Sequence, residues 1–302
     1  MKRFGIALGG GGAKGLAHIP LLEALDELGV RPALIAGTSM GAIIGALYAS
    51  GTPAREVRER MRGMAWSPKD GIADALLHKR VLKWFGMIDM GIRSGGLLKA
   101  DVFLEALDGI LTAETFEELA IPLKVVAADF WKREQAVFES GELLPAINAS
   151  MALPGIFRPC VIGDRVFVDG GAVNPVPFDL LFGACEVTVA VDVSGKRTES
   201  ADLVPSPAEA VFNTFQIMQR SIVQQKLAVR APDLYLQPDI RDVRVLDFHK
   251  ADDVFLQAAA EKERLKRELG RLLAEPEKAP RPGMLARIAG WFRDARKRAG
   301  RP

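Results

Sequence analysis

The chain has 302 residues, of which 49% are hydrophobic and 26% are charged, and a formal net charge of +2. This composition is ordinary for a folded globular protein and excludes intrinsic disorder over most of the length. The small net charge does not indicate a nucleic-acid partner, and the length fits one large α/β domain with a short appendage.

Neither the cysteines nor the amino terminus suggests export. Cys160 and Cys185 both stand among apolar residues, which favours two buried thiols over a disulfide or a metal pair. Glycine interrupts the first apolar run after a few positions, far short of the apolar region of a signal peptide. We therefore expect a cytoplasmic protein.

Two strand-helix units open the chain. A β-rich run at 3–8 leads through the loop GGGGAKG to a helical pattern at 19–29. Pro20 places the start of that helix near Ile19 and leaves irregular backbone before it. A second β-rich run at 32–37 leads into another helix, and units of this kind form a parallel sheet.

The stretch 32–54 contains no charged residue, so its length alone would allow a membrane span. Gly37, Gly41 and Gly45 within it repeat at the spacing found where membrane helices pack. Prolines, glycines, serines and threonines dilute its apolar character, however. A buried strand followed by a buried helix explains the same pattern and is our prediction.

The rest of the chain alternates between helical and strand patterns. Residues 53–120 look mostly helical and form a candidate lid insertion. Helical patterns also cover 206–230 and 251–274. Strands are expected at 121–130, at 135–141, in a hairpin that turns at Gly163 and Asp164, and at 186–193.

These patterns predict a main domain over 1–274, a Pro-rich linker at 275–283 and a basic amphipathic helix at 284–302. The apolar residues of the last segment share one helical face, and its arginines and lysines lie mostly elsewhere. Two interpretations remain open for it. One is peripheral contact of 284–299 with an anionic membrane surface, and the other is docking on protein.

Residues 37–41 read Gly-Thr-Ser-Met-Gly, a Gly-x-Ser-x-Gly pattern between a strand and a helix. In this pattern a sharp turn holds the serine hydroxyl outward as a nucleophile, and Gly37 and Gly41 allow the close approach that the turn needs. Ser39 is therefore a candidate nucleophile, although a lone motif also fits a simple tight turn.

The first loop exposes successive backbone amides from Gly9 to Gly12 at the same sheet edge, where they would suit an oxyanion. Lys14 would add positive charge nearby. Gly10, Gly12 and Gly15 also satisfy the GxGxxG fingerprint, which keeps a nucleotide-binding regulatory module as an alternative. Against it, the second strand does not end in the carboxylate that would hold a ribose.

Two residues compete as the base that accepts the serine proton. Asp169 ends a β-run and precedes Gly170 and Gly171, although Asp-Gly is by itself a favoured turn dipeptide. His249 follows in the chain order of a Ser-Asp-His triad, yet that fold normally places several strands before its nucleophile. His18, close behind the glycine loop, is expected to orient the loop or to pack.

Three segments taken together, GGGGAKGLAHI, GTSMGAIIGALYASG and SMALPGIFRPCVIGDRVFVDGGAVNPVP, resemble the signatures of the bacterial patatin-like phospholipase family and stand in its order over 9–177. The resemblance implies a three-layer α/β/α sandwich with a mostly parallel central sheet. It also implies a lipid acyl hydrolase in which Ser39 is the nucleophile and Asp169 the base. The oxyanion hole would form around Gly10, Gly11 and Gly12, with Lys14, Gly15, Gly37, Gly41, Gly170 and Gly171 as supporting residues.

The implied partner is a lipid ester, either a phospholipid or a lysophospholipid. The implied chemistry calls for no metal and no cofactor. Head group, acyl-chain length and oligomeric state stay open.

Overall fold

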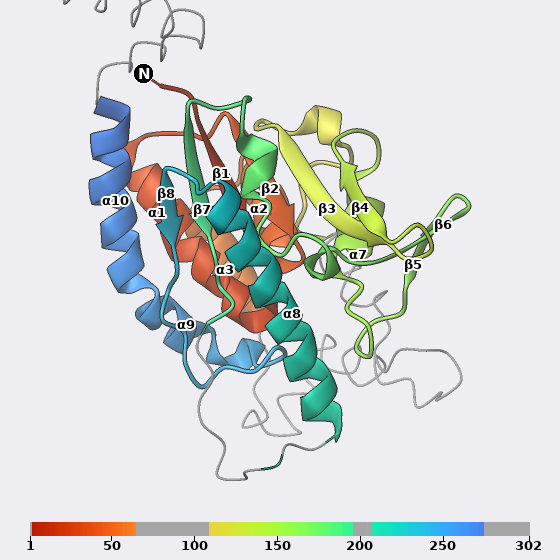
Figure 1. Ribbon diagram of the computed structural model, residues 1–302. Coiled ribbons are helices and arrows are strands. Elements are labelled where there is room, and N and C mark those ends of the chain that lie inside the picture. The colour runs from red at the N-terminus through yellow and green to blue at the C-terminus, as the bar shows by residue number, and fades with distance from the viewer. Residues whose placement is uncertain (1, 65–108, 196–203, 205–206, 275–302) are drawn as a thin grey trace, which may run out of the picture.

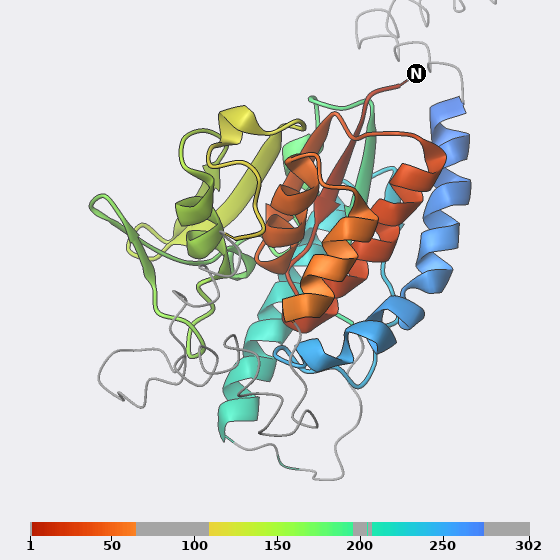
Figure 2. The same cartoon turned by 180° about the vertical axis from the view of Figure 1, so that it is seen from behind.

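The computed structural model describes residues 2–64, 109–195, 204 and 207–274, which form an eight-stranded mixed sheet with helices on both faces (Figures 1 and 2). The strands are β1 (Phe4–Leu8), β2 (Leu34–Thr38), β3 (Leu123–Asp129), β4 (Glu134–Phe138), β5 (Cys160–Ile162), β6 (Arg165–Asp169), β7 (Val187–Val191) and β8 (Leu234–Leu236). Hydrogen-bonded neighbours follow the order β5-β6-β3-β2-β1-β7-β8, and β4 also pairs with β3.

The centre of the sheet is parallel, as the opening strand-helix units predict. β1 pairs in parallel with both β2 and β7, β2 pairs in parallel with β3, and β8 extends the sheet beyond β7. The antiparallel part is confined to β4, β5 and β6. Parallel strands covered on both faces have near-continuous apolar sequences, and every residue of β1, β2 and β7 is buried.

Helices cover the two faces unequally. The helices are α1 (His18–Leu28), α2 (Met40–Ala49), α3 (Ala54–Met64), α7 (Leu143–Met151), α8 (Pro207–Val229), α9 (Ala251–Gln257) and α10 (Ala259–Ala274). Figure 2 shows α1, α2 and α3 on one face, and Figure 1 shows α8 crossing the other. Along β1, Ile6 and Leu8 join the core on the first face, whereas Ala7 packs with Val223 of α8 on the second.

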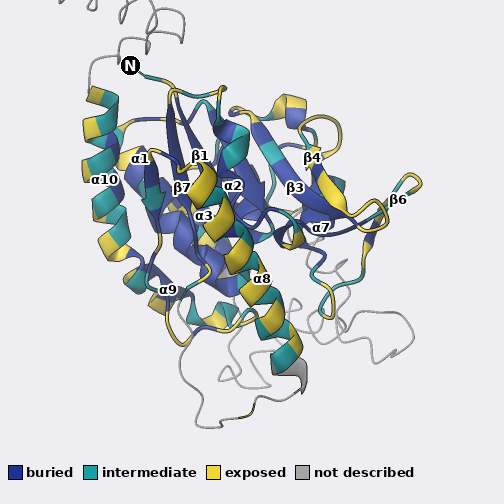
Figure 3. Cartoon of the chain, viewed as in Figure 1, coloured by how far each residue is buried: buried dark blue, intermediate teal, exposed yellow. Residues whose placement is uncertain are grey.

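The charge-free stretch 32–54 forms β2 and a helix that is buried all round. All ten residues of α2 are buried, and Figure 3 shows this helix and the sheet buried together. A Cβ on Gly45 would lie 3.2 Å from Ile35 Cγ2, so the small residues serve helix-on-sheet packing. Within the described ranges, no helix combines the length and the apolar character needed to cross a bilayer.

Several predicted boundaries differ from the structure. The first helix begins at His18, and the residues before it form a 3-10 helix, η1 (Gly12–Ala17), so the expected irregular backbone is wrong there. The helix expected over 251–274 is divided at Ala258 into α9 and α10. The hairpin turns at Gly163 and Asp164 as predicted, with Gly163 at a φ of 62°.

The two ends of the predicted lid segment belong to the main body. Val57 and Met61 of α3 are buried in the large core, and so are Ala113 and Phe116 near the other end of the segment. Residues 65–108 lie outside the described residues, so the lid stays a prediction. The linker at 275–283 and the helix at 284–302 also lie outside them.

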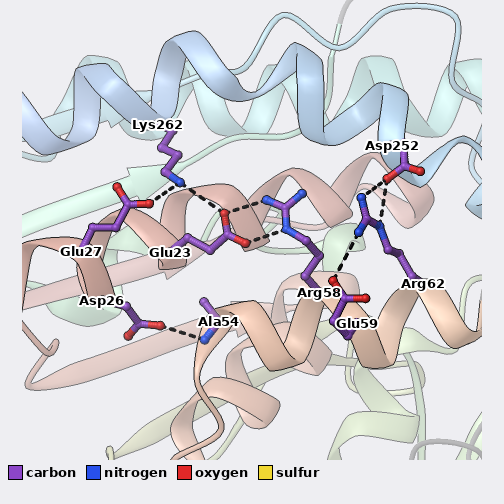
Figure 4. Close-up of polar contacts among 9 residues, drawn as sticks. All are labelled: Glu23, Asp26, Glu27, Ala54, Arg58, Glu59, Arg62, Asp252 and Lys262. Carbon is purple, nitrogen blue, oxygen red and sulfur yellow. Dashed lines mark hydrogen bonds and ion pairs between the residues drawn. The ribbon is translucent and has the colours of Figure 1, made fainter.

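Charged side chains join three helices on the first face. Glu23 of α1 accepts two hydrogen bonds of 2.6 Å from Arg58 of α3 and one of 3.3 Å from Lys262 of α10 (Figure 4). Nearby, Asp26 accepts the Ala54 amide at the start of α3. Burial acts to raise the pKa of Glu23, but the hydrogen bonds from Arg58 and Lys262 outweigh it and hold that pKa below its usual value.

Replacing Glu23 should therefore destabilise the fold. We expect Glu23→Gln to lower the free energy of unfolding by about 1–3 kcal/mol at neutral pH, because Arg58 and Lys262 lose their shared anion. Because the folded-state pKa is depressed, this contribution is complete above the ordinary glutamate pKa and disappears as pH falls through the lower folded-state value. Denaturant unfolding at neutral and acid pH measures both effects.

Glu59→Gln on α3 is the matched control. Glu59 is 61% exposed and pairs with Arg62 one turn away, so its loss should be below about 0.5 kcal/mol. Equal losses in the two variants would contradict the role given to Glu23.

Candidate active site

β2 and β6, which are far apart in sequence, pair with the same edge of β3, one after the other along its length. β2 runs along this edge until Thr38 pairs with Val126, and antiparallel β6 pairs Asp169 with the next residue, Ala127. β4 overlaps both sets of pairs and so occupies the other edge of β3. The carboxyl ends of β2 and β6 therefore meet, and the Ser39 hydroxyl donates a 2.7 Å hydrogen bond to Asp169 Oδ2.

The Ser39 backbone has the strained geometry expected of a nucleophile elbow. Its φ of 54° lies in the region that favours glycine. A Cβ on Gly41 would lie 2.0 Å from the Leu8 carbonyl oxygen, and one on Gly37 would lie 2.6 Å from Ala42 Cα. Neither position accepts a side chain, because α2 starts directly against β1 and β2.

The structure adds Ser150, which the sequence analysis did not single out. The Ser39 amide donates to Ser150 Oγ at 2.8 Å, and the Ser150 hydroxyl donates to the Val126 carbonyl at 2.6 Å. Ser150 lies on α7 and is fully buried. It thus joins the strained turn to the strand that aligns the pair.

The Asp169 carboxylate is buried and held at both oxygens. It is 3% exposed, and its Oδ1 accepts the Gly171 amide at 2.7 Å. Burial raises the pKa of Asp169 to about 6, against the hydrogen bonds from Ser39 and Gly171, which lower it. A Cβ on Gly170 would lie 2.2 Å from the Val126 carbonyl oxygen, so glycine is required directly behind the carboxylate.

The glycine loop presents two amides beside this pair. The Gly10 amide donates to the Pro175 carbonyl at 3.0 Å, so it is not an available oxyanion donor. Its missing side chain still leaves room, since a Cβ would lie 3.3 Å from Ser39 Cβ. Among the residues that the structure describes, no acceptor is paired with the amides of Gly11 and Gly12, and both line the pocket at Ser39.

His18 and Lys14 support the loop from behind. His18 is fully buried, its Nε2 lies 2.8 Å from the Gly9 carbonyl, and burial lowers its pKa to about 4. The ring is therefore neutral, and Nε2–H donates to Gly9. Lys14 donates to the Ser194 carbonyl at 2.8 Å and does not line the pocket, so its position does not support the expected charge beside the serine.

Of the other residues predicted for the site, Gly15 packs against the elbow, whereas His249 lies outside the pocket. A Cβ on Gly15 would lie 2.4 Å from Met40 Cγ, so Gly15 lets η1 approach the start of α2. His249 is exposed on a short 3-10 helix, η5 (Phe248–Lys250), and does not line the pocket. The structure thus brings Asp169 to Ser39 and leaves His249 apart from them.

The pocket above the pair is largely apolar. Its walls come from the glycine loop, α2, the residues after α7, the amino-terminal half of α8 and the segment before η5. The apolar side chains that line it are Met40, Ile43, Met151, Leu153, Ile156, Phe157, Phe212, Phe215, Val245, Leu246 and Phe248. Asp169 is the one ionisable side chain among the described lining residues.

The sequence profile of the family described as "Patatin-like phospholipase" matches residues 6–182, which include the elbow, the glycine loop and Asp169. The chain belongs to the patatin-like phospholipase family. The predicted α/β sandwich with its mostly parallel centre is accordingly the patatin fold.

Several known proteins are similar to this chain over about two thirds of its length or more. An "uncharacterized NTE family protein" of Mycobacterium tuberculosis is 34% identical over 201 residues, which are 66% of this chain and 51% of that protein. Human patatin-like phospholipase domain-containing protein 6 is 29% identical over 278 residues, 83% of this chain and 19% of that protein. Among solved structures, VipD from Legionella pneumophila matches with a TM-score of 0.48 and 14% identity, over 88% of this chain and 67% of that chain.

The contact of Ser150 with the elbow can be measured as stability. In Ser150→Ala the Ser39 amide and the buried Val126 carbonyl both lose a partner, so we expect the free energy of unfolding to fall by about 1–3 kcal/mol in denaturant titrations. Ser50→Ala is the control. Among the described residues the Ser50 hydroxyl bonds only to the Leu47 carbonyl one turn back, so this substitution should cost below about 0.5 kcal/mol. A neutral Ser150→Ala would remove its assigned role.

Proposed function

We propose that this chain is a serine lipid acyl hydrolase that cleaves carboxylic ester bonds of phospholipids or lysophospholipids. The observation that carries the proposal is the 2.7 Å hydrogen bond from Ser39 to the buried Asp169 carboxylate. It is supported by the apolar pocket above the pair and by membership in the family.

In the first half of the reaction Asp169 acts as general base. Its carboxylate accepts the Ser39 proton while Oγ attacks the ester carbonyl carbon. The developing oxyanion accepts hydrogen bonds from the amides of Gly11 and Gly12, and the amino end of α2 favours the same negative charge. Protonated Asp169 then donates its proton to the departing alcohol, which leaves an acyl-Ser39 ester.

In the second half the same residue activates water. Asp169, again ionised, accepts a proton from water as the water oxygen attacks the acyl carbon, and the proton returns to Ser39 Oγ as the fatty acid leaves. A carboxylate has no tautomer to be fixed by a third residue. The Gly171 amide only has to hold its orientation, which explains how two side chains suffice.

The pocket suits the acyl part of the substrate rather than the head group. Phe157, Phe212 and Phe215 supply a large apolar lining, and no described lining residue carries a cation for a phosphate. A head group would accordingly lie outside the pocket. We therefore keep both phospholipids and lysophospholipids as substrates.

Three substitutions test the pair. Ser39→Ala and Asp169→Asn should each lower kcat/KM on phospholipid, lysophospholipid and p-nitrophenyl esters by at least about 10³-fold, because each removes a group that reacts in every cycle. His249→Ala should retain activity within about twofold, since His249 is exposed and away from the pocket. A fluorophosphonate probe should label Ser39.

Other results would favour the alternatives. Loss of turnover in His249→Ala with activity retained in Asp169→Asn would assign the base to His249. Tight nucleotide binding without probe labelling would identify a regulatory module instead.

The activity should also depend on pH through Asp169. The base must be ionised and burial raises its pKa to about 6, so kcat/KM should fall about tenfold per pH unit below pH 6 and level off above it. Initial rates on a neutral soluble ester give this profile, with His249→Ala as the control that keeps it. A midpoint near the ordinary aspartate value would contradict the assignment.

A further inference from the structure

The turn between β3 and β4 exposes two neighbouring aromatic side chains. Phe130 is 47% exposed and Trp131 is 75% exposed, and their rings meet edge to face at 4.9 Å. Lys132 and Arg133 follow directly and are also exposed. Nothing in the proposed chemistry uses this turn, and exposed aromatic pairs of this kind are unfavourable in water.

The turn is nevertheless held rigidly. The Asp129 side chain accepts the Lys132 amide at 2.9 Å and Arg165 Nε at 2.7 Å, and the Asp129 carbonyl accepts the Arg133 amide at 2.9 Å. The Phe130 amide donates to the Val166 carbonyl of β6 at 2.8 Å. Four hydrogen bonds thus fix the backbone that presents the aromatic side chains, so the exposure is a built feature of the turn.

The turn lies at the same end of β3 as the serine and the carboxylate. Ser39 and Asp169 meet opposite Val126 and Ala127, and β3 continues in the same direction to the turn. At about 3.3 Å per residue, Phe130 lies about 10 Å beyond Ala127 along the strand. Figure 1 shows the turn beside the β5-β6 hairpin, at the periphery of the sheet.

The size and chemistry of the tip favour a lipid surface over a protein partner. Two aromatic side chains offer at most about 300–500 Å², whereas a stable protein interface needs about 800 Å² on each partner. Tryptophan prefers the boundary between lipid head groups and acyl chains, and adjacent cations are attracted to anionic lipids. The Lys132 ammonium lies 3.9 Å from the Glu134 carboxylate, and Arg133 forms no ion pair with an acid among the described residues.

We propose that Phe130–Arg133 is a docking element for an anionic lipid bilayer. Phe130 and Trp131 insert among the head groups, while Lys132 and Arg133 contact lipid phosphates. Docking through this turn places the sheet edge that carries Ser39 close to the membrane surface. The inference goes beyond the proposed hydrolysis, because binding needs no reaction at Ser39.

Binding of the full chain to vesicles, measured in a Ser39→Ala background, tests the proposal. Co-sedimentation with phosphatidylcholine vesicles containing phosphatidylglycerol gives a partition coefficient. Phe130→Ser combined with Trp131→Ser should lower it by about tenfold or more. Lys132→Gln combined with Arg133→Gln should lower it about fivefold for each cation, and should have no effect on vesicles of phosphatidylcholine alone.

Val229→Ser is the matched control. Val229 is 88% exposed at the carboxyl end of α8, directly before β8 enters the sheet at its opposite edge, so this change should not alter binding. Equal denaturation midpoints for all variants would show that the two double variants of the turn are folded. As a second measurement, Trp131 should be quenched by brominated lipids in a variant whose Trp66, Trp84 and Trp291 are replaced by Phe.

The outcomes separate docking from hydrolysis. Binding that is unchanged in both double variants of the turn, or absent in the Ser39→Ala parent on every vesicle, overturns the docking proposal. With Ser39 intact, the aromatic double variant should keep its rate on a soluble short ester and lose rate on a vesicle-borne ester. If the Ser39→Ala parent binds vesicles through the turn but the chain with Ser39 intact cleaves no ester, the proposed function fails and the docking element stands.

Discussion

The candidate site depends on a register constraint: β2 and β6 share one edge of β3. Thr38 and Asp169 pair with consecutive β3 residues, so Ser39 and Asp169, which are 130 residues apart in sequence, are fixed within hydrogen-bond reach. A shift of one residue in either pairing would turn the side chains to the other face of the sheet. The pairing of the strands therefore aligns the serine with the carboxylate. The elbow and the Asp-Gly-Gly motif stand at the ends of β2 and β6 that this pairing brings together.

Close backbone approaches make that alignment physically possible. The Leu8 carbonyl lies against Gly41 and the Val126 carbonyl against Gly170, at distances that no Cβ would tolerate. Packing of this kind strains Ser39, and its amide, which lies in a partly buried position, needs an acceptor. Ser150 Oγ is that acceptor, and its hydroxyl donates a hydrogen bond to the Val126 carbonyl of β3. The strand that fixes the register therefore also supports the strained turn.

These relations explain what the sequence predicts and what it does not. The elbow, the parallel centre and the hairpin ending in Asp169 follow from local periodicity and glycine spacing, and the structure contains each of them. β8 has three residues and is a strand because β7 lies beside it, so no local pattern indicates it. Ser150 bonds a residue 111 positions away, and the Gly10 amide is occupied by Pro175. Local spacing does not encode contacts between distant segments. Glycine spacing alone therefore includes Gly10 among the oxyanion donors, although its amide is already bonded.

The buried carboxylate of Asp169 lowers the stability of the folded state. A pKa raised from 3.8 to about 6 means that ionised Asp169 destabilises the folded state by about 3 kcal/mol above pH 6, a penalty that fades as pH falls through that value. A cation beside the carboxylate would remove the penalty and also its basicity. The buried Lys14 donates to Ser194, and the half-buried Lys226 donates to Asn174 and Asp179, so neither pairs with Asp169. Proton abstraction near neutral pH requires a carboxylate with a raised pKa, without a cation beside it, that faces the serine. The register of the strands supplies the stability that holds Asp169 in this position.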